Sequence, residues 1–540
     1  RRVVEVTGGR LPAGPRDGLG RPPAAGQRPH LPTVGHQAAD QPPADETRTT
    51  GHERCRHTVR HTNERDAAPV HAAPVHSAPV HSAPVHNATD GCLSEGLSHR
   101  AAAGNVTSVG DLNVEHVHAV VVGSGFGGSV AAYRLAEAGR SVVLLERGKA
   151  YPPGSFARTP ADVGRNFWDP SEGLHGLFDV WSFRGLDGVV SSGLGGGSLI
   201  YANVLLRKDE RWFVTESPLP AGGYEHWPVS RADLDPHYDR VERMLGATLY
   251  PYQGTRKTEA MRHSAERLGL SWARVPLAVS FAGGPFEPAT PGAPILPQPY
   301  GNLYGLPRRT CRLCGECDLG CNDGAKNSLD HTYLSAAAHH GADLRQRCEV
   351  RGFAPLPGGG YEVRYVRHDP AAEGHRTATR DLPTHRITCD RLILGAGTFG
   401  STFLLLRNRA AFPGISQTLG TRFSGNGDVL AFLLDASDPD APSGHRRIEG
   451  SHGPVITSAI RVGDANDGPG ATGRGFYVQD AGYPVFAEWL VEAAQTGGLL
   501  RRAARVAMAR LRGRLHRTDT SNVSAVLAAL IGPGRLGDGS

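Results

Sequence analysis

The sequence predicts an α/β protein whose first folded unit is a strand, a helix and a second strand. A valine-rich run begins at Val117 and ends in the glycine turn Gly123–Gly128, and a helical pattern follows as far as Gly139. A second apolar run, Val142–Leu145, comes directly after it. Short strands that are apolar throughout are typical of sheets buried on both faces. A strand, glycine turn and helix recur at residues 391–407, so we expect two such turns at the carboxyl ends of strands.

The first turn has the glycine spacing GxGxxG. Gly123 allows the tight turn, Gly125 lets the backbone approach a pyrophosphate, and Gly128 lets helix and strand pack closely. The positive end of the helix dipole then faces the phosphates. Glu146 ends the second strand 18 residues after Gly128, where a carboxylate accepts hydrogen bonds from a ribose diol. The alternative is an ordinary glycine-rich turn, but the strand, helix and acid together favour an adenine dinucleotide.

Composition excludes some classes of function. The chain has 540 residues and a net charge of +5, well short of a nucleic-acid-binding signature. No apolar run approaches the roughly 20 residues of a membrane helix, and there is no signal-peptide pattern. We therefore expect a cytoplasmic or peripheral membrane location. The chain does not begin with methionine, so its first residue need not be the true start.

Residues 1–114 differ from the rest of the chain. They are rich in Pro, Gly, Arg, His and Thr, and a five-residue unit beginning Ala-Pro-Val-His recurs four times from Ala68. Such a segment buries too little apolar surface to offset its ordering entropy. We predict a disordered tail, and metal binding by its histidines is the weaker alternative.

A second glycine tract, Ser191–Asn203, contains three successive glycines followed by Ser198. Backbone N–H groups in such a tract can reach a flat or charged ligand without interference from Cβ atoms, although a flexible loop is the alternative. The aromatic stretch Tyr151–Asp187 before it is interpreted either as a lid or as part of the core. After the tract, residues 233–245 form a helical pattern, for which we predict Asp235 as the N-cap and Pro236 as the first helical residue.

Four cysteines lie close together at a spacing of CxxCxxCxxxC, which is that of the bacterial ferredoxin run apart from its final proline. An iron–sulfur cluster or a zinc ion is one interpretation, and local disulfides or a set of buried thiols are the others. The four are Cys311, Cys314, Cys317 and Cys321.

The C-terminal part has three strand-like stretches, Val429–Leu434, Pro454–Val462 and Phe476–Val478. They are followed by the basic helical pattern Leu499–Leu515. This helix is interpreted as a solvated helix of an ordinary domain, with peripheral contact to an anionic membrane as the alternative.

Taken together, these motifs resemble the glucose–methanol–choline (GMC) family of flavoprotein oxidoreductases, and most of all its cholesterol-oxidase-like branch. The matching segments are GSGFGGSVAAYRLAEAGRSVVLLERG, SSGLGGGSLIYANVLL, the cysteine run with GCNDGAKNSLDHTYL, and LILGAGTFGSTFLLLRN. The resemblance implies a Rossmann-like FAD-binding domain, residues 115–210 and 301–427. It also implies an interleaved substrate domain on an antiparallel sheet, with a cap segment at 211–300 and the remainder at 428–540.

The resemblance also implies which residues bind FAD. The first motif would hold the ADP half with Glu146 on the ribose, and the second would lie beside the pyrophosphate and flavin. Val350 would meet the adenine through its backbone. The full set is Gly123, Ser124, Gly125, Gly128, Glu146, Arg147, Gly195, Gly196, Gly197, Ser198, Asn203, Val350, Gly395 and Gly397.

Two features depart from the family pattern. Tyr201 stands where many relatives have an asparagine, and Asn203 follows two places later. The segment resembling H-P-L-G-G-C that carries the family's catalytic histidine is not found, and the only histidine after Ile460 is His516. No catalytic residue is assigned, and we expect the chain to end before the catalytic segment.

The expected function is FAD-dependent oxidation of an apolar alcohol, a sterol or a long-chain alcohol, with oxygen or another electron acceptor. Three alternatives are kept. They are an inactive flavin-binding remnant, an NAD-linked dehydrogenase that shares the first motif, and an electron-transfer protein that uses the cysteine cluster.

Overall fold

The computed structural model describes residues 114–183, 186–208, 213–218, 224–421, 423, 425, 428–433, 437–438, 441–445, 449–462, 476–484 and 524–529. All of them belong to one compact unit of the chain. The tail predicted at residues 1–114 lies outside the described residues apart from its last residue, and so do the basic helix Leu499–Leu515 and His516.

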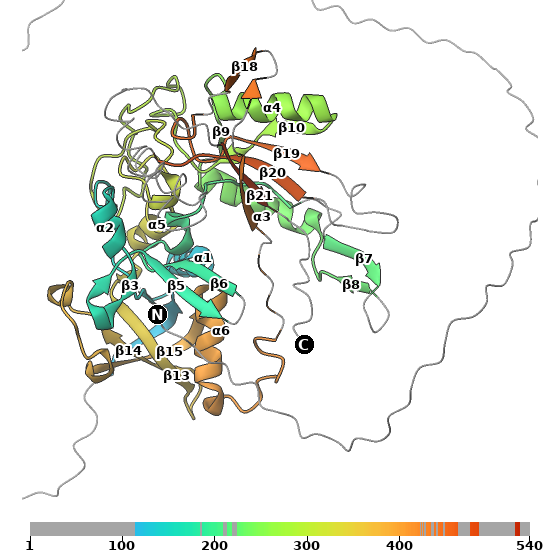
Figure 1. Cartoon of the computed structure of the whole chain (residues 1–540). Coiled ribbons are helices and arrows are strands. Elements are labelled where there is room, and N and C mark those ends of the chain that lie inside the picture. The colour runs from blue at the N-terminus through green and yellow to red at the C-terminus, as the bar shows by residue number, and fades with distance from the viewer. Residues whose placement is uncertain are drawn as a thin grey trace, which may run out of the picture. The chain divides into compact units, whose positions relative to one another are not determined.

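The predicted α/β unit is confirmed as part of a six-stranded sheet (Figure 1). The strand order is β12-β2-β1-β15-β14-β13. Strands β12, β2, β1 and β15 run parallel to one another, whereas β14 and β13 are antiparallel additions at one edge. The strands are β1 (His116–Val122), β2 (Val142–Leu145), β12 (Asp343–Arg345), β13 (Cys348–Pro355), β14 (Tyr361–Arg367) and β15 (Thr384–Leu394).

Both faces of the central strands are covered, which explains their unbroken apolar sequence. Along β1, Ala119 and Val121 pack under α1 (Phe126–Glu137) and α5 (Tyr333–His339). Val120 and Val122 pack on the other face with residues of β13, β14 and β15 and with Leu404 of α6 (Gly397–Arg407). The alternation follows from the two-residue period of a strand.

A second, five-stranded antiparallel sheet has the order β10-β19-β20-β21-β16, as the family resemblance implies. Helix α4 (Arg256–Leu268) packs on this sheet (Figure 1). Its Met261 and Ala265 meet Ile460 and Val462. The strands are β10 (Ser271–Arg274), β16 (Asp428–Leu433), β19 (Ser458–Val462), β20 (Phe476–Ala481) and β21 (Ser524–Ala529).

The aromatic stretch after β2 forms two hairpins. The second of them packs Trp181 and Phe183 against Phe399 of α6, with ring centroids 5.9 and 4.9 Å apart. Five two-stranded pairs, these two hairpins among them, and two helices complete the described strands and α-helices. They are β3 (Trp168–Asp169) with β4 (Leu174–His175), β5 (Phe178–Phe183) with β6 (Leu186–Ser191), β7 (Val214–Pro218) with β8 (Tyr224–His226), β9 (Thr248–Leu249) with β11 (Pro276–Leu277), β17 (Ser437–Asp438) with β18 (Ala441–His445), α2 (Pro160–Arg165) and α3 (Arg231–Met244).

The predicted start of α3 is wrong. The helix begins at Arg231, capped by Ser230, whose side chain accepts from the Asp233 N–H while the Asp233 side chain accepts from the Ser230 N–H. Pro236 therefore lies inside the helix. The reciprocal capping box satisfies backbone donors at the true start of the helix, and Pro236 removes one backbone hydrogen bond from the turn that follows.

Within the described part of the chain, none of the helices combines the length and the apolar character needed to cross a membrane.

Candidate cofactor-binding site

Three glycine turns from distant parts of the sequence lie against one another. A Cβ atom on Gly123 would stand 2.7 Å from the carbonyl oxygen of Gly395. One on Gly395 would stand 2.7 Å from Cα of Gly128, and one on Gly196 would stand 2.6 Å from Cα of Gly125. Because Cβ atoms do not approach backbone this closely, only glycine permits these contacts. The structure thus brings the turns together at the carboxyl ends of β1 and β15.

Three glycines of the turns, Gly125, Gly127 and Gly197, have no such reason within the described protein. Gly125 has an ordinary φ of −68°, and the nearest atom to its ideal Cβ is 3.9 Å away. Gly197 is exposed, and no heavy atom of the described chain lies within 4 Å of its ideal Cβ. The glycines at the contacts described above allow the turns to touch, whereas these three leave the backbone open.

Neither helix that starts at these turns is capped by a side chain within the described residues. The N-cap of α1 is Gly125 and that of α6 is Ala396. The first N–H groups of a helix carry a partial positive charge and need partners. The starts of α1 and α6 are therefore suited to an anionic ligand.

Glu146 is almost fully buried at the end of β2, and its carboxylate is held by backbone and side-chain donors. One oxygen accepts from the N–H of Ser124 at 2.9 Å and from its hydroxyl at 2.6 Å. The other accepts from the N–H of Gly148 at 2.9 Å. A carboxylate has about four acceptor positions, so one position of Glu146 is left for a ligand hydroxyl.

Two predicted residues lie beside this acid. Arg147 forms an ion pair with Asp179 at 2.8 Å, and its guanidinium lies over the ring of Trp168. Val350 lies in β13 next to a bulge in its pairing with β14. Strand β13 reaches the acid because the N–H of Cys348 donates to the carbonyl oxygen of Glu146.

The second glycine tract contains one residue held for structural reasons and one without partners. The Ser198 hydroxyl donates to the carbonyl of Gly195 and accepts from the N–H of Leu329, so it joins two loops. Asn203 is fully buried and has a φ of +70°. Neither polar atom of its amide has a hydrogen-bond partner among the described residues. A buried amide without partners is costly, and this one lines a cavity of about 20 Å³.

Lys326 is a site residue that the sequence analysis did not single out. It is buried, and its ammonium donates to the carbonyl oxygens of Leu199, Tyr201 and Cys317 at 3.1, 2.6 and 3.0 Å. Burial lowers the pKa of Lys326 to about 8. The side chain thereby fastens the second glycine tract to the cysteine run. Its one sequence signal is its position in the segment that follows the cysteines.

The cysteine run also lines the small cavity, but its thiols are free. In the part of the chain that the structure describes, no three His, Cys, Asp or Glu side chains are arranged to hold a metal ion. Burial raises the pKa of the Cys311 thiol well above its usual value and that of Cys314 to about 12. The geometry therefore does not support iron–sulfur or zinc ligation by Cys311, Cys314, Cys317 and Cys321. The disulfide alternative is wrong, because the four thiols are free; Cys311 is buried and the other three are half-buried.

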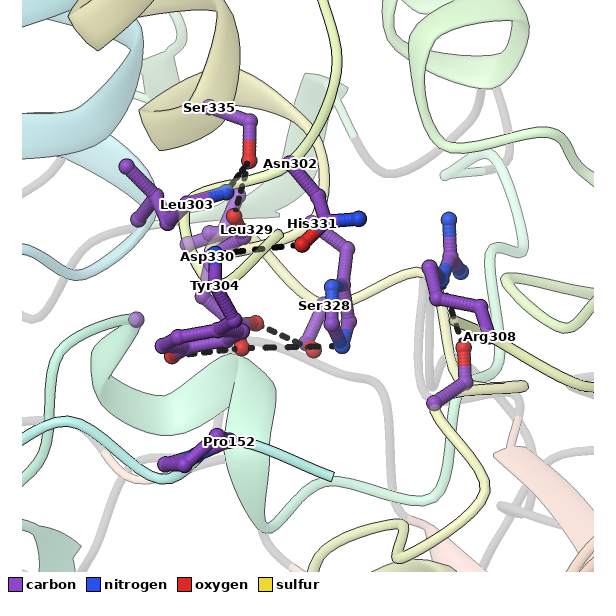
Figure 2. Close-up of polar contacts among 12 residues, drawn as sticks. Pro152, Asn302, Leu303, Tyr304, Arg308, Ser328, Leu329, Asp330, His331 and Ser335 are labelled. Carbon is purple, nitrogen blue, oxygen red and sulfur yellow. Dashed lines mark hydrogen bonds and ion pairs between the residues drawn. The ribbon is translucent and has the colours of Figure 1, made fainter. Parts of the chain in front are cut away.

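Behind the second tract lies a buried polar cluster centred on Asp330 (Figure 2). Its carboxylate accepts from the hydroxyls of Tyr304 at 3.0 Å and Ser328 at 2.5 Å. The hydroxyl of Ser335 donates to the Asp330 carbonyl. His331 is also buried here, with Nε2 3.8 Å from the Asp330 carboxylate. The cluster fixes the segment from which Leu329 bonds Ser198.

His331 predicts a loss of stability in acid. Burial lowers its pKa from 6.5 to about 4, so the folded chain keeps it neutral where the unfolded chain protonates it. The stability linked to this residue is complete above pH 6.5 and is lost as the pH falls towards 4. We expect His331→Phe to reduce the fall in unfolding free energy between pH 7 and 5 by about 1–2 kcal/mol, measured by denaturant titration. Between pH 7 and 9 the difference between variant and parent should be constant, and an unchanged acid profile would contradict the prediction.

Comparison with known proteins places these features in a family. Residues 121–176 match the model of an NAD(P)-binding Rossmann-like domain, and residues 307–416 match the model described as GMC oxidoreductase. The chain is 35% identical over 363 residues to a cholesterol oxidase of Mycobacterium tuberculosis, covering 66% of this chain and 58% of that protein. It is 30% identical over 334 residues to a cholesterol oxidase of Acinetobacter baumannii, covering 60% and 57%. A long-chain-alcohol oxidase of Arabidopsis thaliana is 24% identical over 276 residues, covering 49% and 30%. The chain thus spans somewhat more than half the length of the two cholesterol oxidases.

Proposed function

Because the chain belongs to the GMC oxidoreductase family, we propose that it binds FAD at the three glycine turns and serves the oxidation of an alcohol. The observation that carries the proposal is that the three turns meet where several glycines, among them Gly125 and Gly197, have no packing reason within the described protein. When bound, FAD would supply a flavin ring that accepts the carbinol hydrogen as hydride while a base takes the hydroxyl proton.

The residues of the site divide between the parts of the cofactor by their chemistry. Glu146 has one acceptor position for a ribose hydroxyl, and the uncapped start of α1 suits the pyrophosphate. Val350 and Arg147 flank the acid on the adenine side. The amide of Asn203, which has no partner among the described residues, is assigned to the flavin side of the second tract. Gly395 and Gly397 stand at the start of α6, where the first N–H groups are suited to an anionic part of the cofactor.

The substrate class proposed is an apolar alcohol, a sterol or a long-chain alcohol, with oxygen as electron acceptor. Its support is the character of the relatives, which include two cholesterol oxidases and a long-chain-alcohol oxidase. No residue is proposed as the catalytic base.

The proposal is tested on the purified 540-residue chain. We expect it to bind FAD with a flavin absorption spectrum, and a sterol or long-chain alcohol to bleach that spectrum under anaerobic conditions. Bound flavin that no alcohol reduces would favour the inactive remnant. A colourless chain that does not take up FAD but binds NAD would overturn the proposal in favour of the dehydrogenase.

Gly197→Ala separates cofactor contact from folding. The new methyl group would meet no described atom of the protein, so we expect the unfolding free energy of the apoprotein to change by less than about 0.5 kcal/mol. If the tract faces FAD, the methyl group intrudes on the ligand, and the Kd for FAD should rise at least about tenfold, measured by quenching of flavin fluorescence.

Gly358→Ala is the matched control, since its ideal Cβ is equally open. Gly358 lies in the turn between β13 and β14. The strand after this turn pairs with β15 at Cys389, and Cys389 in turn pairs with Val117 at the start of β1. That is the end of β1 opposite to the glycine turns, so the affinity of this variant for FAD should equal that of the parent. Equal affinities of all three proteins would remove Gly197 from the site.

A further inference from the structure

Ser124 of the first glycine turn makes hydrogen bonds both to Glu146 and to the second glycine tract. It is fully buried in the turn between β1 and α1. Its hydroxyl lies 2.6 Å from Oε2 of Glu146 and accepts from the N–H of Gly195 at 2.9 Å. The carbonyl oxygen of Gly193 is farther away, at 3.3 Å.

The single hydroxyl proton decides the direction of these bonds. A hydroxyl has one proton to donate and two lone pairs to accept with. The carboxylate is charged and closer, and charge-assisted hydrogen bonds are the shorter and stronger ones. The proton therefore goes to Glu146, and Gly195 donates to one of the oxygen lone pairs. The hydroxyl is saturated by the protein and has no further proton to offer a ligand.

These hydrogen bonds connect the residue assigned to the ribose with the second glycine tract. Glu146 is the residue assigned to the ribose, and Gly195 is the N-cap of the short 3-10 helix Gly196–Leu199 in the second tract. Without the hydroxyl, the carboxylate would lose one of its three donors, and the Gly195 N–H would lose its acceptor. A buried donor without an acceptor costs about 1–3 kcal/mol, so both groups would shift to find other partners.

We propose that Ser124 is a positioning residue for FAD: its hydroxyl holds the Glu146 carboxylate and the second glycine tract in one fixed geometry. The inference rests on the proposed FAD binding and goes beyond it, because it removes the Ser124 hydroxyl from the groups that touch the cofactor. The affinity for FAD then depends on a side chain that acts through Glu146 and Gly195.

The experiment compares Ser124→Ala with Ser129→Ala. Ser129 is a fully buried serine of α1 whose hydroxyl donates to the carbonyl of Phe126 inside the same helix. Both apoproteins are titrated with FAD at a temperature at which each is folded, so that differences in stability do not enter the Kd. We expect Ser124→Ala to raise the Kd about 10- to 100-fold, the range of a lost hydrogen bond to a charged group. Ser129→Ala should stay within about twofold of the parent.

The variant Glu146→Gln tests the route of the effect. If Ser124 acts through Glu146, adding Ser124→Ala to Glu146→Gln should raise the Kd by clearly less than it does in the parent. Additive effects, or equal losses in the two serine variants, would overturn the proposal. If Ser124→Ala does not fold, Ser124→Cys replaces it, since a thiol is a weak donor of similar size. A parent chain that does not bind FAD would refute the proposed function, whereas FAD binding unaffected by Ser124→Ala would refute this inference alone.

Discussion

Lys257→Met is expected to destabilise the chain by about 3–5 kcal/mol, because it leaves a charge buried without its partner. Lys257 of α4 and Asp480 of β20 are both almost fully buried, and their charged atoms are 2.5 Å apart. The Asp480 carboxylate also accepts from the backbone N–H groups and the hydroxyls of Thr457 and Ser458. In the variant this carboxylate would keep its other donors but lose its only cationic partner among the described residues.

The loss is measured by denaturant unfolding, with Arg262→Met as the control. Arg262 lies on the same helix and pairs with Glu259 and Glu266 on a partly exposed face. Exposed pairs contribute about 0–1 kcal/mol, so the control should cost less than about 1 kcal/mol. If both variants lose the same small amount, the ion pair does not hold α4 to the five-stranded sheet.

This ion pair marks the limit of what could be predicted from the sequence. The segment Arg256–Leu268 contains charged residues throughout, and although Lys257 shares a helix face with Met261 and Ala265, that local spacing does not identify its partner. Its partner is 223 residues away. Burial of a lysine is decided by long-range packing, whereas hydrophobic periodicity reports on local structure.

The glycine turns were predictable for the opposite reason. Each is specified by a few adjacent residues, namely an apolar strand, a turn that only glycine permits and a helix. The helix start at Arg231 was missed although its signal was equally local. Ser230 and Asp233 form a capping box, but the dipeptide of Asp235 and Pro236 gives a competing start signal four to five residues after the first helical residue.

The roles within the turns could not be separated by sequence. Gly123 and Gly128 pack protein on protein, whereas Gly125 and Gly197 leave the backbone open, and the motif records all of them as glycine. Similarly, the sequence predicts that Ser124 and Ser198 both bind the cofactor. In the structure both hydroxyls form hydrogen bonds within the protein. Whether a hydroxyl bonds within the protein or is available to a ligand depends on partners from distant segments of the sequence.

Gly128→Ala is expected to cost about 3 kcal/mol or more and to abolish measurable FAD binding. Its Cβ would stand 1.9 Å from the carbonyl oxygen of Gly123 and 3.0 Å from the carbonyl carbon of the same residue. Backbone cannot yield as a flexible side chain does, so α1 would have to move away from β1, and overpacking of this kind destabilises strongly. The movement would also separate Gly128 from Gly395. These two residues are so close that a Cβ atom on Gly395 would stand 2.7 Å from Cα of Gly128.

The neighbouring Gly127→Ala gives the sharpest contrast. Gly127 lies in the same helical turn, yet its ideal Cβ has no neighbour within 4 Å in the described chain. Alanine is the better helix former by up to about 1 kcal/mol, so this variant should unfold at an equal or higher denaturant concentration than the parent. Two glycines one residue apart would then respond in opposite directions to the same added methyl group. Both substitutions change helix propensity alike, so the difference between their unfolding free energies measures the contact of α1 with the first turn. A difference below about 1 kcal/mol would contradict the tight packing on which the three-turn site depends.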